Sequence, residues 1–321
     1  MGSVGVPLEA VPPFRLDLTV WALRRRPVNE MDRWDGQTYR RVFHLPGGPT
    51  EVAVTQRGSP EEPRLEMDLA PSPTHPQDVV AAAATLTRVL GLTVDLAPFY
   101  TLASTDARLG PLAEQFRGLK PPRFPSIFET LITAIACQQV TLAFGLRLLN
   151  RLTEAFGAPA PTGHRAFPQP QDLAGVDEEA LRELSFSRQK ARAILGIAQA
   201  AADGSLLLEG MEALDDAAVM ERLTALRGIG RWSAEYVLLR GLGRLHVFPG
   251  DDVGGRGNLQ RWLGLEEPLN YEGVQRMVAP WQPYAGLVYM HLLLWRLDEQ
   301  GLIEKKYIVL TSHKANRRNK V

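Results

Sequence analysis

A very short glycine turn between two predicted helices limits the folds open to this chain more than any other feature. Apolar residues at helical spacing predict helices over 215–225 and 232–242. Between them, Gly228-Ile229-Gly230 needs residues without a Cβ at its tightest points. Ile229 is placed to lock the turn, which leaves the two glycines facing a ligand. We therefore predict a helix-hairpin-helix unit here.

The start of the second helix is a predicted anion site. Its first N–H groups lack intrahelical acceptors, and the helix dipole adds partial positive charge. Together with Gly228, Ile229, Gly230, Arg231 and Ser233, these groups would bind a DNA phosphate mainly through the backbone. Such binding does not require a net positive charge on the whole protein. It is therefore compatible with a chain that has 36 Lys and Arg against 36 Asp and Glu.

The chain changes character near residue 100. Before that point, alternation of apolar and polar residues predicts strands of one antiparallel sheet, at 14–23, 38–45, 50–57 and 64–71. A helix is predicted over 79–92. After residue 100 helical patterns dominate, beginning with a Ser126-x-x-Glu129 capping box. We therefore predict a mainly α fold with an N-terminal α+β domain.

The pattern divides the chain into three parts. We expect an α+β domain over 1–100, a helical region over 101–300 and a basic tail over 301–321. The last 17 residues hold six Lys or Arg and no acid. They could form a phosphate-contacting arm or a solvated tail.

Metal, cofactor and membrane functions find no support in the sequence. The single cysteine, Cys137, excludes an intrachain disulfide and a four-cysteine zinc or iron–sulfur site. The six histidines are scattered, so we expect no metal centre and no cofactor. The N-terminus lacks a signal-peptide pattern, and no apolar run approaches ~20 residues. We expect a monomer in the cytoplasm, associated with the nucleoid.

A pair of acidic residues follows a Pro-Gly turn about twenty residues after the hairpin. Asp251 and Asp252 stand at the head of a predicted helix, where either could be an N-cap. Beside the hairpin, the pair also suggests a carboxylate held next to nucleic acid. Farther along, Gly255 and Gly257 disfavour helix by roughly 1 kcal/mol each against Ala, so we expect a late helix start or a mobile loop.

This combination resembles the helix-hairpin-helix (HhH-GPD) DNA glycosylase superfamily and, within it, the AlkA-like 3-methyladenine DNA glycosylase II group. Residues 226–252 are similar to its hairpin and catalytic loop, and 95–141 to the entrance of its helical domain. The N-terminal strands match its α+β domain more weakly. The resemblance implies an active-site cleft between two helical lobes. It is also compatible with a structural cation at the hairpin.

The resemblance also implies roles for individual residues. Asp252 aligns with the catalytic aspartate, which stabilises positive charge on the sugar as the N-glycosidic bond breaks. Trp232 and Tyr236, four residues apart on one helix face, would wall the base pocket, whereas the residues alone favour core packing. Tyr284 stands where the group usually has another pocket aromatic. Trp21 would close the pocket from the N-terminal domain, with core packing as the alternative.

The resemblance also bears on the mechanism through Gln138, Gln139, Trp232 and Asp251. Gln138 and Gln139 would lie at the DNA, with Gln139 as the wedge that fills the space of a flipped base. The alternative for both is a polar helix end. Trp232 stands where backbone-cutting relatives carry a lysine, and an indole cannot form a Schiff base. For Asp251, capping is the expected role.

The resemblance therefore implies a monofunctional glycosylase without AP lyase activity. It would hydrolyse the N-glycosidic bond of alkylated purines in double-stranded DNA by base flipping, and so initiate base excision repair. One alternative keeps the fold and changes the lesion to uracil or hypoxanthine. The other is a non-catalytic protein that binds damaged DNA, although a pure hairpin module needs no acid at position 252.

Overall fold

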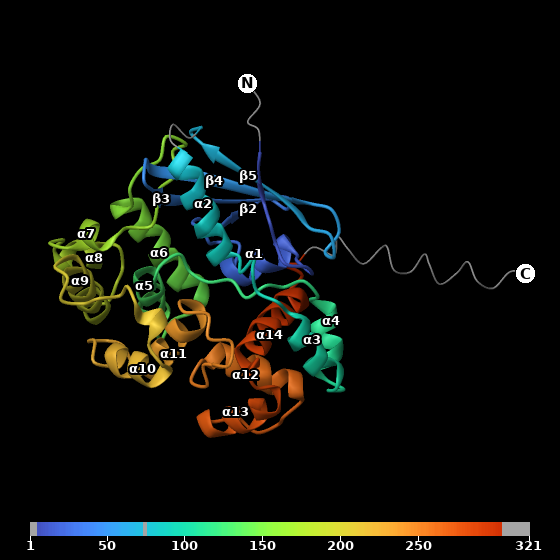
Figure 1. Cartoon of the computed structure of the whole chain (residues 1–321). Helices are drawn as coiled ribbons and strands as arrows, with labels where there is room; N and C mark the ends of the chain where they lie inside the picture. The colour runs from blue at the N-terminus through green and yellow to red at the C-terminus, as the bar shows by residue number, and fades with distance from the viewer. Residues whose placement is uncertain (1–4, 73–75, 304–321) are drawn as a thin grey trace, which may run out of the picture.

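A computed structural model describes residues 5–72 and 76–303, with a sheet followed by helices (Figure 1). Within these residues the sheet has five antiparallel strands in the order β1-β5-β4-β3-β2. They are β1 (Val6–Leu8), β2 (Arg33–Trp34), β3 (Thr38–Leu45), β4 (Gly48–Arg57) and β5 (Arg64–Ala70). The predicted fold class, mainly α with an N-terminal antiparallel sheet, is confirmed.

The predicted strand at 14–23 is wrong, because these residues form helix α1 (Leu16–Arg24). Alternate apolar positions from 16 to 20 suit a strand, but the unbroken apolar run that follows suits a helix buried on nearly every side. Leu16 packs in the sheet core, whereas Trp21 packs in the core of the C-terminal helices. The helix therefore lies between two apolar surfaces, which local alternation cannot reveal. Helix α2 (Pro76–Val89) covers the same sheet core.

The helices that follow form two lobes, each around its own hydrophobic core, and Figure 1 shows both groups beside the sheet. The first lobe holds α5 (Ile127–Cys137), α6 (Leu142–Phe156), α7 (Pro170–Leu173), α8 (Glu178–Glu183), α9 (Arg188–Ala202), the 3-10 turn η1 (Met211–Ala213), α10 (Asp216–Thr224) and α11 (Arg231–Arg240). The second lobe holds α3 (Ala97–Ser104), α4 (Leu109–Gln115), α12 (Val253–Leu263), α13 (Tyr271–Val278), η2 (Ala279–Trp281) and α14 (Ala285–Glu299). The domain boundaries from the sequence stay a prediction.

Half of the predicted capping box at the start of α5 is present. The Ser126 hydroxyl accepts the Glu129 N–H at 3.0 Å, as expected for an N-cap. The Glu129 carboxylate does not complete the box, because it pairs with Arg41 instead. A charge partner from the sheet has therefore replaced the local contact that the sequence pattern suggested.

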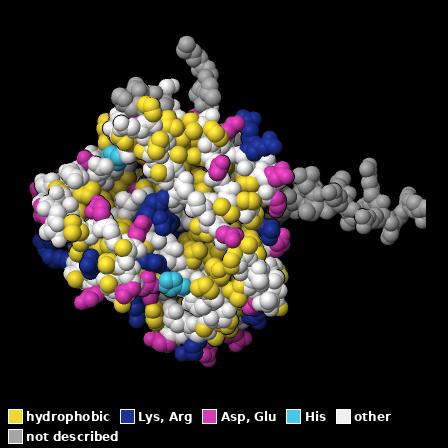
Figure 2. Space-filling model, viewed as in Figure 1, with side chains coloured by type: hydrophobic (Ala, Val, Ile, Leu, Met, Phe, Trp, Pro, Cys, Tyr) yellow, Lys and Arg dark blue, Asp and Glu magenta, His cyan; other side chains and the backbone are white. Residues whose placement is uncertain are grey.

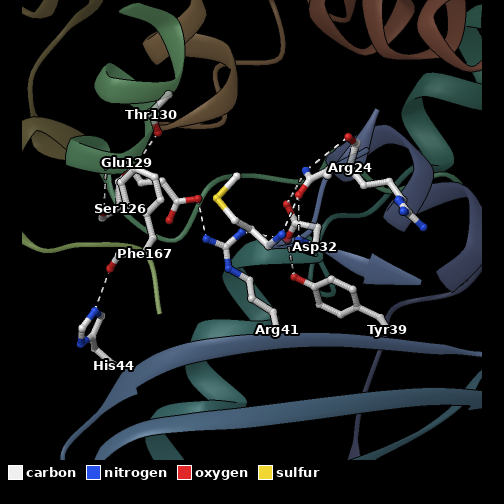
Figure 3. Close-up of polar contacts among 11 residues, drawn as sticks. Arg24, Asp32, Tyr39, Arg41, His44, Ser126, Glu129, Thr130 and Phe167 are labelled. Atoms are coloured by element: carbon white, nitrogen blue, oxygen red, sulfur yellow. Dashed lines mark hydrogen bonds and ion pairs between the residues drawn. The ribbon is translucent and has the colours of Figure 1, made fainter. Parts of the chain in front are cut away.

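That partner belongs to a buried group that we call the paired seam: Asp32, Tyr39, Arg41 and Glu129 (Figure 3). Arg41 lies between the two carboxylates, 2.8 Å from Asp32 and 2.5 Å from Glu129. Tyr39 donates to Asp32 at 2.9 Å. Burial raises the pKa of Glu129, against the opposing effect of Arg41. The paired seam joins the N-terminal region to the first lobe.

Candidate active site

The glycine turn joins α10 to α11 as predicted and packs on the first lobe. Gly228 has a φ of +85°, and a Cβ there would lie 2.8 Å from the Ala193 Cβ. Ile229 is buried in the core of the first lobe. Gly230 is the N-cap of α11, and no side chain caps this helix start. The first-turn amides of α11 are therefore oriented for an external acceptor.

Gln138 braces this turn against the end of α5. Its Nε2 donates to the Gly228 carbonyl at 2.8 Å and to the Ser233 hydroxyl at 2.9 Å. Ser233 is itself buried, so its side chain supports the hairpin from within. Gln139, by contrast, is exposed and has a left-handed φ of +54°. Backbone of this kind in a non-glycine residue is concentrated at functional positions.

Three donors from three helices converge on the Asp252 carboxylate. The Gly255 N–H donates to Oδ1 at 2.7 Å, which makes Asp252 the N-cap of α12. Trp232 Nε1 and the Tyr289 hydroxyl each donate to Oδ2 at 3.1 Å. The N-cap interpretation of Asp252 is therefore confirmed, and its role beside nucleic acid stays a prediction. Because α11 belongs to the first lobe and α14 to the second, the carboxylate lies where the two lobes meet.

Tyr289 was missed by the sequence analysis, and Gly255 explains its place. A Cβ on Gly255 would lie 2.3 Å from the Tyr289 ring, so glycine lets α12 rest directly on that ring. Helix α12 begins at Val253, so the predicted late start is wrong. Burial and the nearby Asp252 raise the pKa of Tyr289 well above its usual value. Tyr289 is therefore protonated and able to donate.

Trp232 and Tyr236 lie together on one face of α11, as their spacing predicted. Their ring centroids are 5.7 Å apart with planes inclined at 33°. Tyr236 is buried, and its ring packs 6.1 Å from Phe124. Trp232 is half-buried, so it forms the outer layer of this stack. The stack lies beside the Asp252 carboxylate through the Trp232 indole.

Two buried arginines lie behind the stack, and with Phe124 and Tyr236 they form what we call the aromatic seam. Arg25, at the end of α1, is 7% exposed, and its Nη1 donates to the Tyr236 hydroxyl at 2.8 Å. Arg240, at the end of α11, is 1% exposed and donates to the Ala22 carbonyl at 2.9 Å. The aromatic seam is the second junction between the N-terminal region and the first lobe.

The predicted capping role of Asp251 is wrong. Its carboxylate instead pairs with Arg231 Nε at 2.7 Å. The Arg231 guanidinium also lies 3.7 Å from the Tyr271 ring centroid. Tyr271 in turn donates to Glu235 at 2.6 Å. Arg231 thus links the hairpin to the loop that carries Asp252.

The remaining predicted pocket residues, Trp21 and Tyr284, pack in or against the core of the second lobe. Trp21 is buried in its core and carries the Arg24 guanidinium 5.1 Å from its ring centroid. Core packing, the alternative interpretation, accounts for this placement. Tyr284 packs edge-on against Phe99, with ring centroids 5.8 Å apart. Neither ring supplies a donor to Asp252, and their pocket roles stay predictions.

A cavity of about 670 Å³ lies beside the paired seam, where Arg41, His44 and Glu129 line it (Figure 3). It is separate from the surroundings of Asp252, and the cleft predicted between the lobes stays a prediction. In the part of the chain that the structure describes, no group of three His, Cys, Asp or Glu could hold a metal ion. Across residues 5–72 and 76–303, no helix is long and apolar enough to cross a membrane.

The charged surface shows no continuous basic face in the view of Figure 2, where Lys and Arg alternate with Asp and Glu. This agrees with the equal numbers of both charges in the sequence. The basic tail predicted over 301–321 lies, from residue 304 on, outside the described residues.

Two protein-family models match the chain. Residues 132–283 match the HhH-GPD superfamily of base excision DNA repair proteins. Residues 6–126 match the AlkA N-terminal domain. The first match includes the hairpin, Trp232, Tyr236 and Asp252, and the second covers the sheet.

Individual proteins agree with the family matches. The DNA-3-methyladenine glycosylase of Bacillus subtilis is 31% identical over 206 residues, which cover 63% of this chain and 67% of that protein. The 3-methyladenine DNA glycosylase of Archaeoglobus fulgidus has a similar structure, with a TM-score of 0.79, 26% identity, and coverage of 90% of this chain and 97% of that one. The 3-methyladenine DNA glycosylase of Schizosaccharomyces pombe, in complex with abasic DNA, has a TM-score of 0.55 and 26% identity. The match covers 61% of this chain and 95% of the S. pombe chain.

Proposed function

This chain belongs to the HhH-GPD superfamily of base excision DNA repair proteins, and on this basis we propose that it removes alkylated purines from double-stranded DNA. The substrates would be of the 3-methyladenine and 7-methylguanine type. One observation carries the proposal: Asp252 is held by Trp232 and Tyr289 beside a hairpin whose second helix starts without a side-chain cap. The names of the similar proteins support the same lesion class.

The chemistry follows from where Asp252 is held. The damaged nucleotide swings out of the duplex and its sugar comes to rest near the carboxylate. As the bond from C1′ to the base breaks, its electron pair leaves with the base and positive charge develops on the sugar. The carboxylate stabilises that charge, and it is already oriented by three donors. Water then supplies the hydroxyl to C1′, with Asp252 as the acceptor for its proton.

The backbone of the DNA is left uncut in this proposal. A lyase step needs an amine nucleophile at the sugar, and the side chain in place is the Trp232 indole, which donates to Asp252. We therefore infer a monofunctional enzyme that leaves an abasic site. The amides at Gly230 and Arg231 hold a phosphate, and Gln139 fills the space of the flipped base. A structural cation at the hairpin stays a prediction.

Asp252→Asn tests this function directly, because asparagine keeps the N-cap while removing the charge. Release of 7-methylguanine from methylated duplex DNA should fall by at least about 100-fold, while binding to abasic-site DNA persists. Asp251→Asn is the matched control, since it removes the same charge one residue away and should have a far smaller effect. Unchanged release in Asp252→Asn would remove this residue from its proposed role.

The same assay separates the remaining alternatives. A wild-type protein that binds damaged DNA and releases no base would be a non-catalytic binder. Release of uracil or hypoxanthine in place of methylated purines would change the lesion class. Borohydride treatment during turnover should trap no covalent adduct, and a trapped adduct would contradict the hydrolytic mechanism.

A further inference from the structure

The loop that ends at Asp252 rests on one face of α13. A Cβ on Gly250 would lie 2.6 Å from the Tyr271 ring, so glycine brings this loop into direct contact with the ring. One helical turn later, Gln275 Nε2 donates to the Phe248 carbonyl at 3.3 Å. Tyr271 and Gln275 are four residues apart and therefore lie on the same face of α13. The second lobe thus supports the loop at points two and four residues before the proposed catalytic carboxylate.

Tyr271 is held in turn by a buried carboxylate from the first lobe. Its hydroxyl donates at 2.6 Å to Glu235, which lies on α11 and is 7% exposed. Burial raises the pKa of Glu235, against the opposing effect of this hydrogen bond. Burial and the same bond raise the pKa of Tyr271 to about 12, so the phenol stays protonated and donates. Because a buried carboxylate is costly unless it is hydrogen-bonded, the two residues hold each other in place across the lobes.

One face of the Tyr271 ring also carries the Arg231 guanidinium, 3.7 Å from the ring centroid. Arg231 Nε pairs with Asp251 at 2.7 Å, but the arginine side chain is 49% exposed. Solvent weakens an ion pair of this kind, and its geometry depends on what fixes the two side chains. The ring holds the planar guanidinium in one orientation by stacking. Tyr271 therefore acts on the loop twice, directly at Gly250 and through Arg231 at Asp251.

We propose that Tyr271 is a positioning residue whose ring fixes the loop 248–251 and thereby places the Asp252 carboxylate against the sugar. This inference rests on the proposed glycosylase function. The three donors that contact this carboxylate orient the side chain, whereas the position of its backbone depends on the loop. A displacement of about 1 Å at a reacting group slows a reaction by up to about 100-fold. In this role Tyr271 contacts neither the substrate nor the reacting atoms.

Tyr271→Leu tests the inference, because it removes the ring and keeps an apolar side chain. For release of 7-methylguanine from methylated duplex DNA, kcat should fall by about tenfold while KM stays within about threefold of wild type. Tyr271→Phe retains the ring and should keep kcat within about threefold. Tyr100→Leu is the matched control. Its ring carries the Arg117 guanidinium at 4.5 Å on α3, which lies apart from α11 (Figure 1), so its kcat should be unchanged.

Gly250→Ala disturbs the same contact from the loop, so the test does not depend on how well Tyr271→Leu folds. The added methyl group would push the loop off the ring, and kcat should fall by at least about threefold with little change in KM. Gly257→Ala is its control, because a Cβ there meets no atom within 4 Å.

Far-UV circular dichroism and thermal melting establish which variants are folded. A folded Tyr271→Leu or a Gly250→Ala that turns over at the wild-type rate would overturn the inference. So would a Tyr271→Phe or a Tyr100→Leu that is as slow as Tyr271→Leu. A wild-type protein that releases no methylated base would instead contradict the proposed function.

Discussion

The N-terminal region meets the first lobe at two junctions that handle buried charge in opposite ways. In the paired seam, Arg41 contacts two carboxylates, Asp32 and Glu129. In the aromatic seam, Arg25 and Arg240 contact rings and oxygen atoms that carry no formal charge. Both junctions are buried, so solvent screens neither. They differ in whether the buried charges have opposite-charge partners.

The difference separates a junction whose buried charges are paired from one whose buried charges are held by rings and neutral oxygen atoms. Charges that serve only to join two parts are stabilised by opposite charges, because an unpaired buried ion is costly. The aromatic seam leaves Arg25 and Arg240 without an opposite charge in ion-pair range among the residues that the structure describes. We therefore expect stability to depend more on the paired seam than on the aromatic seam.

The largest effect on stability is expected from Arg41→Met. This change leaves Asp32 and Glu129 as uncompensated buried carboxylates, so the free energy of unfolding should fall by about 3–5 kcal/mol. Urea unfolding at pH 7 measures the loss. The triple variant with Asp32→Asn and Glu129→Gln should regain most of it, because neutral amides need no counter-charge. A loss under about 1 kcal/mol would make the two seams energetically alike.

Acid sensitivity has a separate source in the second lobe. Burial lowers the pKa of His291 to about 4, despite its hydrogen bond to the Leu287 carbonyl. The folded state therefore binds fewer protons than the unfolded state between pH 6.5 and 4. The stability that comes from burying a neutral His291 is fully present above pH 6.5. As the pH falls toward 4, the free energy of unfolding decreases by about 3 kcal/mol.

His291→Leu removes this titration, and urea unfolding at pH 7 and pH 4 measures the change. Between pH 7 and pH 4, the free energy of unfolding of the variant should rise by about 3 kcal/mol relative to that of the wild type. A constant difference between wild type and variant across this range would show that His291 is not the titrating group.

A smaller effect on stability is expected from Arg240→Met in the aromatic seam. The change removes a buried charge that has no ion-pair partner within residues 5–72 and 76–303, and it leaves the Ala22 carbonyl without its donor. The free energy of unfolding should fall by about 1–2 kcal/mol. Urea unfolding beside Arg41→Met gives the comparison under one set of conditions. An equal loss in the two variants would contradict the distinction between the seams.

Local patterns were enough to predict the hairpin, the antiparallel sheet and an N-cap at Asp251 or Asp252. The turn depends on adjacent glycines, and most strands alternate along a few residues. Helix α1 was predicted as a strand because its first residues fit both the strand period and the helix period. The surfaces on either side of it come from distant segments of the chain. Its burial by both the sheet and the second lobe is a tertiary property.

The site was only partly predictable for the same reason. Tyr289 lies 37 residues beyond Asp252, yet a tyrosine inside the apolar run 286–295 did carry a signal, because a buried hydroxyl requires a partner. Arg25 carried none, since it is the middle of three consecutive arginines. The left-handed backbone at Arg25, with φ of +63°, ends α1 there, and the side chain reaches the Tyr236 hydroxyl.

Gly255 and Gly257 look equivalent in the sequence, but they offer opposite prospects for engineering heat resistance. Alanine at 257 would meet no atom within 4 Å, and its higher helix propensity is worth about 1 kcal/mol. Alanine at 255 would bring a methyl group within 2.3 Å of the Tyr289 ring and displace the phenol that orients Asp252. A thermostabilisation scheme guided by helix propensity alone would therefore succeed at one glycine and forfeit turnover at the other, only two residues away.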